Sequence, residues 1–273
     1  AGFAGLSAAR RLHQIDRKLD IVVLEARRAG EGPAGRNSGF MIDLPHNLGK
    51  ENYVSSASHD QQQTMINRGA IAFAREAAAE LAMAKEAFEE SGKINAAATA
   101  KGHAHNLRYA RHLEELSEEH ELLDEQVMQE LCGSSSYLSG LFTPGTAMLQ
   151  PALYIREMAA GLAKGGISIC ENSAVTGMRR VGLDWEVVTN SGKVTAQQAI
   201  LATNGHVESF GFFRHRLMHV YLYASMTAPL DNDRRRKLGG KDRWAFTPAD
   251  PMGTTVRRIS GTGGTRLIVR NGF

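Results

Sequence analysis

The spacing of apolar and polar residues changes several times along the chain, and each change predicts a structural element. Residues 2–12 are dense in small and apolar side chains at helical intervals, which predicts a helix at the start. Residues 21–24, Ile-Val-Val-Leu, form a continuous aliphatic run, which is typical of a strand buried on both faces in a parallel sheet. A glycine-rich loop at 29–39 follows, where an ordinary βαβ unit would place another helix.

The clearest helical pattern runs from Asp60 to Glu90. Its apolar residues recur every three or four positions and form one stripe: Ile66, Ala70, Phe73, Ala77, Leu81, Ala84 and Phe88. We interpret this stripe as packing against a second domain rather than as a surface for a partner. The chain then predicts, in order, an extended stretch at 94–99, a helix capped by Asn106 that runs to Glu119, and a shorter helix between Asp124 and Gly133.

The period changes from helix to strand in the second half of the chain. Pro151 fits the first turn of a helix that runs to Lys164 and is stopped by a glycine pair at 165–166. The segments that read as strands after it are 167–171, 175–181, 185–189, 198–202, 220–227 and 256–269.

The composition is that of an ordinary globular protein. Of the 273 residues, 42% are hydrophobic and 22% charged, and this length allows two domains. The net charge is only +3, and the one dense basic cluster, Arg234 to Lys237, is flanked by Asp231, Asp233 and Asp242. A solvated loop explains such a cluster better than a nucleic-acid surface does, so no nucleic-acid partner is expected.

The two cysteines, Cys132 and Cys170, lie far apart and form no CxxC pair. Their spacing argues against a disulfide scaffold and against a thiolate metal site, and it suits a reducing compartment. No apolar run approaches the ~20 residues that a membrane-spanning helix needs. We therefore expect no metal, no integral membrane segment and a cytoplasmic location.

Gly2 and Gly5 occupy the second and third glycine positions of a dinucleotide-binding fingerprint. In that fingerprint the second glycine lets the backbone approach the pyrophosphate, and the third lets the helix pack on the sheet. Helix N-termini favour the phosphate charge because their N–H groups are free. Glu25 ends the next strand 23 residues after Gly2, where a carboxylate bonds the ribose hydroxyls and repels a 2′-phosphate. The four features together predict an unphosphorylated dinucleotide.

The loop after Glu25 decides between FAD and NAD. An NAD-binding half would fold its crossover helix at once, whereas this chain has eleven loop residues at 29–39. Arg36, Asn37 and Ser38 in that loop are donors that suit a pyrophosphate or a flavin ring. We therefore predict FAD, and an NAD-linked dehydrogenase remains the alternative.

Three motifs carry a resemblance to a known family: residues 2–9 (GFAGLSAA), 23–26 (VLEA) and 35–40 (GRNSGF). They resemble the D-amino acid oxidase/glycine oxidase superfamily of FAD-dependent oxidoreductases, and the branch they look most like is the gamma-glutamylputrescine oxidoreductase-like enzymes. Residues 150–154, 171–175 and 200–205 are also similar to family segments. The fingerprint and the resemblance together imply these cofactor-binding residues: Gly2, Phe3, Ala4, Gly5, Glu25, Ala26, Arg27, Arg36, Asn37, Ser38, Gly39, Val175, Ala202, Thr203, Asn204 and Gly205.

The resemblance implies an α/β fold, with a Rossmann-like FAD domain of the glutathione reductase type and a second α+β substrate domain. We expect the FAD domain at 1–48 and 147–214, and the substrate domain at 49–146 and 215–273. Relative to the family, the chain lacks the first strand and first glycine, and it stops before a further glycine-rich segment. It therefore looks like a fragment truncated at both ends, and we expect it to bind FAD poorly in isolation.

The implied reaction is oxidation of a C–N bond. Hydride passes to the flavin, an imine remains and hydrolyses, and oxygen or an electron carrier reoxidises the flavin, with hydrogen peroxide as the product in the first case. His46, close behind the flavin loop, is the candidate for handling an ammonium proton. One of four arginines, Arg257, Arg258, Arg266 or Arg270, is the candidate for clamping a substrate carboxylate, and Arg258 is our choice.

The sequence leaves the substrate open between amines and amino acids. It also leaves open oxidase or dehydrogenase chemistry, covalent or non-covalent flavin, and the oligomeric state. A non-catalytic flavoprotein-like fragment stays as a further alternative, alongside the NAD-linked enzyme.

Overall fold

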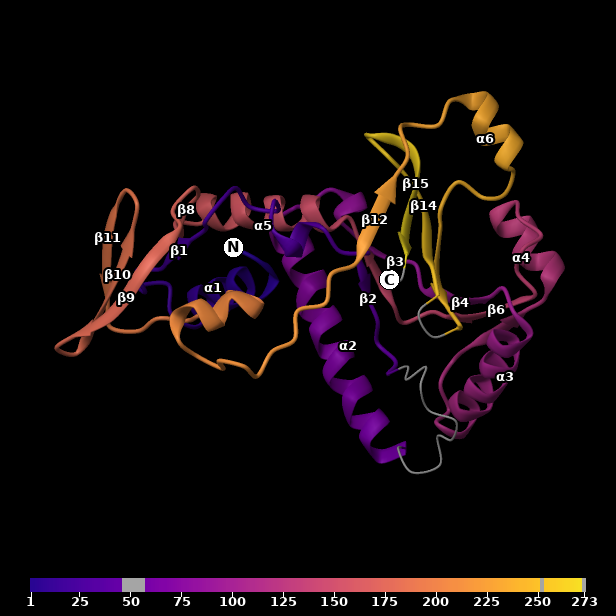
Figure 1. Ribbon diagram of the computed structural model, residues 1–273, viewed down its shortest axis with the longest axis horizontal. Helices are drawn as coiled ribbons and strands as arrows, with labels where there is room; N and C mark the ends of the chain where they lie inside the picture. Colours follow the sequence, from indigo (N-terminus) through magenta and orange to yellow (C-terminus); the bar gives the residue numbers. More distant parts are fainter. Residues whose placement is uncertain (46–56, 251–252, 272–273) are drawn as a thin grey trace. The chain divides into compact units, whose positions relative to one another are not determined.

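The computed structural model describes residues 1–45, 57–250 and 253–271 (Figure 1). This part of the chain forms two compact units, each assembled from segments that are distant in sequence. The first unit contains residues 1–39, 75–88 and 149–220, and the second contains 40–74, 89–148 and 221–273. The segment 75–88 thus belongs to the first unit, although the sequence placed it in the second domain.

The first unit is built on a helix and two parallel strands. Helix α1 (Phe3–Ile15) leads into β1 (Val22–Leu24), which pairs in parallel with β8 (Ser168–Cys170). Helix α5 (Pro151–Lys164) contacts α1 and begins at the proline, as predicted. The other elements of this unit are η1 (Pro33–Gly35), η2 (Lys85–Ala87), the antiparallel sheet β9 (Val175–Val181), β10 (Asp184–Thr189) and β11 (Gly192–Ala196), and η3 (Asn204–Phe210).

The core of the first unit lies between α1, α5 and the last turns of α2 (Ala57–Glu80). Its buried apolar side chains are Leu6, Ala9, Ala77, Tyr154, Ile155, Met158 and Leu162. Arg10 is buried among them, and its Nε and Nη2 atoms donate to Oε2 of Glu80 at 2.9 and 2.6 Å. A buried guanidinium needs such a partner, so this pair ties α1 to the end of α2.

The second unit is organised around a seven-stranded sheet with the order β12-β15-β14-β13-β4-β6-β5. All neighbours in it are antiparallel except β13 and β4, which run in parallel. The strands are β12 (Tyr223–Met226), β15 (Gly264–Asn271), β14 (Thr255–Gly261), β13 (Trp244–Pro248), β4 (Lys93–Ala97), β6 (Ser139–Thr143) and β5 (Glu121–Leu123). A smaller sheet has the order β2 (Phe40–Met41), β7 (Ala147–Leu149) and β3 (Phe88–Glu90).

Two helices pack on opposite faces of the large sheet. Helix α3 (Ala100–Glu115) contributes Tyr109, Ala110 and Leu113 to a buried cluster with Leu141. Helix α4 (Glu125–Cys132) contributes Met128 and Cys132 to a second cluster, with Ile94, Ala96, Leu123 and Phe246. Successive strand residues point to opposite faces, which separates these two sets of strand residues. As predicted, Asp124 caps α4 and Gly133 ends it in the left-handed conformation.

The helix predicted for 60–90 is shorter than expected, and its stripe is in a different phase. Helix α2 ends at Glu80, and Ala82 adopts a left-handed φ of 48° before η2 and β3. Ile66 and Ala70 are exposed, whereas the buried positions are Asp60, Thr64, Ile71, Ala74 and Ala77. The predicted stripe was therefore wrong in its first half, where the Asp60 carboxylate turns inward to the buried His112 of α3, at 3.1 Å.

Three other expectations need correction. Helix α3 begins at Ala100 and is capped by Thr99, whose Oγ1 accepts from the Gly102 N–H at 3.0 Å. Asn106, the predicted cap, is buried within α3 and donates from Nδ2 to the carbonyl of Asn95 at 2.8 Å. No strand forms at 198–202 in the described chain. The strand that pairs with β10 in this region is β11, which ends before residue 198. Strand β1 is not buried on both faces, since Val22 is 37% exposed.

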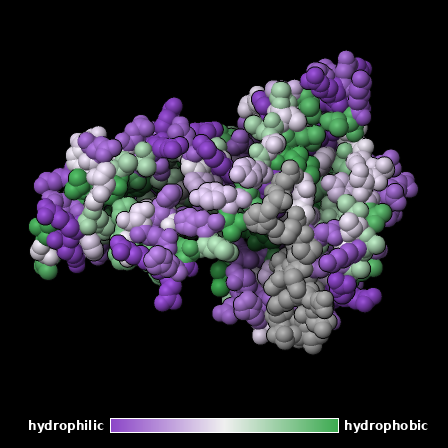
Figure 2. Space-filling model, in the orientation of Figure 1, coloured by the Kyte–Doolittle hydropathy of each residue, from purple (hydrophilic) through white to green (hydrophobic). Residues whose placement is uncertain are grey.

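The predicted basic cluster forms helix α6 (Asn232–Leu238), which is solvated. Hydrophilic side chains gather over it at the upper right of Figure 2. Arg235 bonds Asp242 at 2.6 Å, and Arg236 pairs with Asp233, so acidic neighbours compensate the arginines. No helix among the described residues combines the length and apolarity needed to cross a membrane.

Candidate cofactor site

The start of α1 brings three distant segments together. Gly2 is the N-cap of α1, in an extended conformation with φ −109° and ψ −172°. A Cβ on Gly2 would lie 3.4 Å from Cβ of Ala34 in the glycine-rich loop, and a Cβ on Gly5 would lie 3.3 Å from Cβ of Ala202. The two fingerprint glycines therefore allow the loop and the 202–205 segment to approach the helix closely. Phe3 and Ala4 lie in the first turn, which carries no acidic side chain.

Glu25 directs its carboxylate at this same turn. Its Oε1 accepts from the Arg27 N–H at 3.0 Å, and its Oε2 lies beside the backbone nitrogen of Ala1, the residue before the N-cap. Its backbone bonds the strand β8 region, donating to the carbonyl of Cys170 at 2.9 Å and accepting from the Ser173 N–H at 2.8 Å. The end of β1, with Ala26 and Arg27 exposed just beyond it, is thus fixed beside the helix N-terminus. This is the position from which a carboxylate bonds a ribose.

Backbone constraints shape the glycine-rich loop. Gly30 has φ +82°, and a Cβ on Gly35 would lie 1.9 Å from the Gly30 carbonyl oxygen. Asn37 closes the loop: its Nδ2 donates to the Ala34 carbonyl at 2.7 Å and its Oδ1 accepts from the Gly39 N–H at 2.8 Å. Asn37 therefore stabilises the loop, and we assign its side-chain amide to these two backbone hydrogen bonds rather than to a ligand.

Arg36 differs from its neighbour in this loop. It is exposed, and although its backbone N–H donates to the Pro33 carbonyl at 3.1 Å, its side chain makes no hydrogen bond or ion pair with any residue in the described ranges. Ser38 is half-buried, and Gly39 is buried with a left-handed φ of 77°. The guanidinium of Arg36 is thus the uncommitted cation of the loop, and guanidinium groups suit phosphate oxygens.

The second cofactor segment contains a buried hydroxyl without a partner. Thr203 is the N-cap of η3, and its Oγ1 has no hydrogen-bond partner within the described chain. Asn204 follows with a left-handed φ of 51°. A Cβ on Gly205 would lie 2.7 Å from the His219 ring, so a larger residue there would displace that side chain. Val175 begins β9, half-buried and two residues beyond the Ser173 contact with Glu25.

These groups fit a dinucleotide. Three groups offer donors to a pyrophosphate: the N-terminus of α1, whose first turn has no acidic residue, the side chain of Arg36, and the unpartnered hydroxyl of Thr203. Glu25 offers acceptors to ribose. In addition, the model of the FAD dependent oxidoreductase family (DAO) matches residues 1–271. The chain belongs to this FAD-dependent oxidoreductase family. The predicted cofactor, FAD, and the predicted family are thereby confirmed, while the gamma-glutamylputrescine oxidoreductase-like branch stays a prediction.

Curated relatives of this chain carry the name probable oxidoreductase OrdL. The protein from Haemophilus influenzae is 28% identical over 220 residues, covering 76% of this chain and 48% of its own length. The one from Rhizobium meliloti is 24% identical over 214 residues, with the same coverage. The chain thus spans about half the length of the curated relatives that it matches.

Solved structures confirm the fold class. Glycine oxidase from Bacillus cereus has a TM-score of 0.71 at 15% identity and covers 99% of this chain and 71% of its own. Glycine oxidase from Geobacillus kaustophilus has a TM-score of 0.68 at 14% identity, covering 97% of this chain and 66% of its own. At such identities the likeness speaks for the fold alone.

The structure commits Arg258, our candidate for the substrate, to structural contacts. Its Nη1 donates to the Gly239 carbonyl at 2.5 Å and its Nη2 to Asp242 at 3.0 Å, and the side chain is buried. Arg258 pairs with Trp244, so it lies on the sheet face that packs on α4. Arg257 lies on the opposite face, with its guanidinium 5.6 Å from the Phe40 ring centroid. Burial lowers the pKa of Arg257 to about 10.

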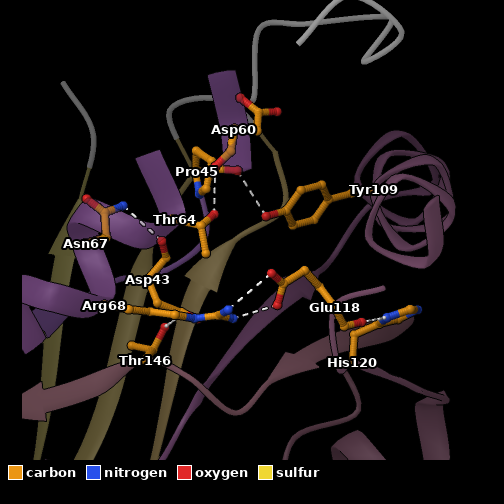
Figure 3. Close-up of polar contacts among 10 residues, drawn as sticks. All are labelled: Asp43, Pro45, Asp60, Thr64, Asn67, Arg68, Tyr109, Glu118, His120 and Thr146. Atoms are coloured by element: carbon orange, nitrogen blue, oxygen red, sulfur yellow. Dashed lines mark hydrogen bonds and ion pairs between the residues drawn. The ribbon is translucent and has the colours of Figure 1, made fainter. Parts of the chain in front are cut away.

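Sequence reasoning missed a polar network just after the flavin loop (Figure 3). Asp43 is fully buried and accepts from Nε and Nη2 of Arg68 at 3.3 and 3.1 Å and from Oγ1 of Thr146 at 3.3 Å. Arg68 also bonds Glu118 at 3.1 and 2.5 Å, and these bonds are the main reason that the pKa of Arg68 is raised. In the sequence, the signal for this network was an acidic residue, Asp43, placed shortly after the apolar strand β2.

Asp43, Arg68 and Glu118 line a cleft of about 390 Å³ in the second unit. The network fixes the segment that leads to Pro45, whose carbonyl accepts from the Tyr109 hydroxyl at 3.1 Å. His46, our catalytic candidate, lies outside the described residues.

Proposed function

We propose that the protein oxidises the C–N bond of an amine or amino acid, with FAD as the acceptor. Bound FAD would take hydride from the carbon that bears the nitrogen, leaving an imine that water hydrolyses. Oxygen, giving hydrogen peroxide, or another electron carrier would restore the cofactor. The residues of this chain supply binding and orientation.

The observation that carries the proposal is the convergence at the N-terminus of α1. Gly2 and Gly5 admit the loop and the 202–205 segment, and Glu25 points at the same turn. In this proposal the N–H groups of α1 and Arg36 bind the pyrophosphate, Glu25 binds the ribose, and Thr203 donates its orphan hydroxyl. Val175 would contact the adenine through its backbone, as the family resemblance implies.

The substrate contact moves from Arg258 to Arg257 in this proposal. Arg258 bonds Asp242 and Gly239 on the sheet face that packs on α4, and Arg257, on the opposite face, stands over Phe40, the residue that directly follows the flavin loop. A guanidinium there suits a substrate carboxylate, which it bonds in a bidentate manner. His46 stays the candidate for accepting an ammonium proton. The names of similar structures, glycine oxidase and L-proline dehydrogenase, agree with an amino-acid substrate and with either kind of acceptor.

The test uses the full-length protein that contains this chain. We expect it to purify with stoichiometric flavin, seen by its absorbance bands, and to form peroxide or reduce a dye with a panel of amines and amino acids. Flavin without turnover on any amine would contradict the reaction, and binding of NAD instead of flavin would favour the alternative dehydrogenase. The Glu25→Gln variant should lower FAD affinity about tenfold, because a charged acceptor for the ribose is lost.

A further inference from the structure

A row of polar side chains crosses the large sheet beside Arg257. Arg257 pairs with Ala245 across β14 and β13, and Lys93 pairs with Thr143 across β4 and β6. The parallel register, with Phe246 beside Ile94, places Ala245 next to Lys93. Cross-strand neighbours share a face, so a guanidinium, an ammonium group and a hydroxyl lie in one row. The two cationic residues stand two strand spacings apart, or about 10 Å between backbones.

Lys93 is the residue of this row that the proposed function leaves unexplained. It is 2% exposed, and the single hydrogen bond of its side chain to the described residues runs from Nζ to Oδ1 of Asn95 at 2.5 Å. Asn95 is neutral, so this bond leaves the ammonium charge uncompensated. An isolated buried charge is costly, and buried charges in proteins are as a rule paired with a group of opposite charge.

Asp43 is the carboxylate whose charge acts on Lys93, but it is not a bonded partner for the ammonium group. Its charge raises the pKa of Lys93, but burial dominates and lowers that pKa to about 8. All the side-chain hydrogen bonds of Asp43 to described residues go to Arg68 and Thr146. Asp43 therefore acts on Lys93 only through space.

Thr143, opposite Lys93, gives an independent sign of a missing ligand. Its side chain is fully buried, and its Oγ1 has no hydrogen-bond partner within residues 1–45, 57–250 and 253–271. A buried hydroxyl without a hydrogen-bond partner costs free energy, and a ligand that offers it an acceptor or a donor would recover that cost. A carboxylate would satisfy the ammonium group and the hydroxyl together.

The middle of the row is open. Ala245 is half-buried, although Lys93 and Arg257 on either side of it are buried. Arg243 lies two residues before Ala245, on the same face, and pairs with Glu89. The row therefore has only a methyl group between the two cations, with a further arginine at the margin.

We propose that the amine substrate carries a second carboxylate, which Lys93 and Thr143 hold while Arg257 holds the first. The proposal rests on the proposed function and narrows its substrate to amines with two acidic groups, such as acidic amino acids. Lys93 and Thr143 are then residues that determine specificity. An anion at Lys93 also favours the protonated amine, so binding must raise the pKa of Lys93 and take up protons near pH 8.

The binding test uses two matched anions on the full-length protein, glutarate with two carboxylates and butyrate with one. We expect calorimetry to show glutarate binding at least about tenfold more tightly, with uptake of ~0.5 proton at pH 8 in buffers of different ionisation enthalpy. Lys93→Met should abolish the uptake and remove the preference, and the isosteric Thr143→Val should weaken glutarate by about fivefold. Lys101→Met, at an exposed position in α3, is the matched control and should change nothing.

Turnover then separates this proposal from the proposed function. Glutamate should be preferred over norvaline, which has a methyl group in place of the second carboxylate, and Lys93→Met should raise KM for glutamate alone. Equal binding of glutarate and butyrate, no proton uptake, or an equal effect of Lys93→Met on both ligands would overturn the second-carboxylate site and show Lys93 to be a core lysine. A wild-type protein that binds no flavin, or turns over no amine, would instead refute the proposed function and leave the glutarate result standing.

Discussion

The two units build their candidate sites from different materials. In the first unit the site is mainly backbone: glycines at 5 and 35 permit close approaches, and few side chains are committed. In the second unit the polar residues beside Phe40 are charged side chains held in a sheet, with Lys93 and Arg257 buried. A backbone site excludes added atoms wherever the chain approaches itself closely, whereas a site of buried charges responds most to changed charge. The difference predicts which substitutions each region withstands.

The largest expected effect is that of Gly35→Ala in the backbone site. A Cβ there would lie 1.9 Å from the Gly30 carbonyl oxygen, so the loop must rearrange. We expect the full-length protein to lose FAD affinity by at least about 100-fold, or ~3 kcal/mol, measured by quenching of flavin fluorescence. Gly32→Ala in the same loop is the control, because no atom lies within 4 Å of its added Cβ. Comparable losses in both variants would show that loop flexibility, not close approach, is what matters.

Lys93→Met tests the charge-based site through stability. The pKa of Lys93 falls from 10.5 to about 8 on folding, so the unfolded chain binds more protons between these values and stability rises with pH there. Below pH 8 the full cost of burying the charge applies, about 3 kcal/mol from a shift of 2.5 units.

The variant should therefore be about 3 kcal/mol more stable than the wild type at pH 7, and this gain should vanish by about pH 10.5. Urea unfolding at several pH values measures it. A destabilised variant at pH 7, or a gain that does not depend on pH, would mean that Lys93 is well compensated in the fold.

The contrast also explains which parts of the molecule could be predicted from sequence. The fingerprint glycines, Glu25 and the helix starting at Pro151 depend on neighbours a few residues away, so local spacing is enough to predict them; the helix is confirmed and the cofactor roles stay predictions. Asn106 as a cap and the stripe through Ile66 failed because long-range contacts decide which side of a helix is buried. The family resemblance supplied Val175 and Gly205, which no local pattern distinguishes.

The choice of Arg258 over Arg257 shows the same limit in one dipeptide. Two adjacent arginines in a strand must point to opposite faces, and sequence predicts that much. Which face packs on α4 depends on Trp244 and Phe246 of β13, a strand that the sequence analysis missed. Lys93 escaped notice because a lysine at the start of a strand is usually solvated, and only the covering of its sheet face buries it.

The smallest expected effect belongs to an exposed charge, and it marks the boundary of the charge-based site. Arg236 is 79% exposed and pairs with Asp233 one helical turn away. Such pairs contribute about 0–0.5 kcal/mol, because water and salt screen them. Arg236→Ala should therefore leave urea stability, FAD affinity and glutarate binding unchanged within error. A loss of glutarate affinity in this variant would mean that diffuse positive charge attracts the anion, and the specific row of Lys93, Thr143 and Arg257 would lose its support.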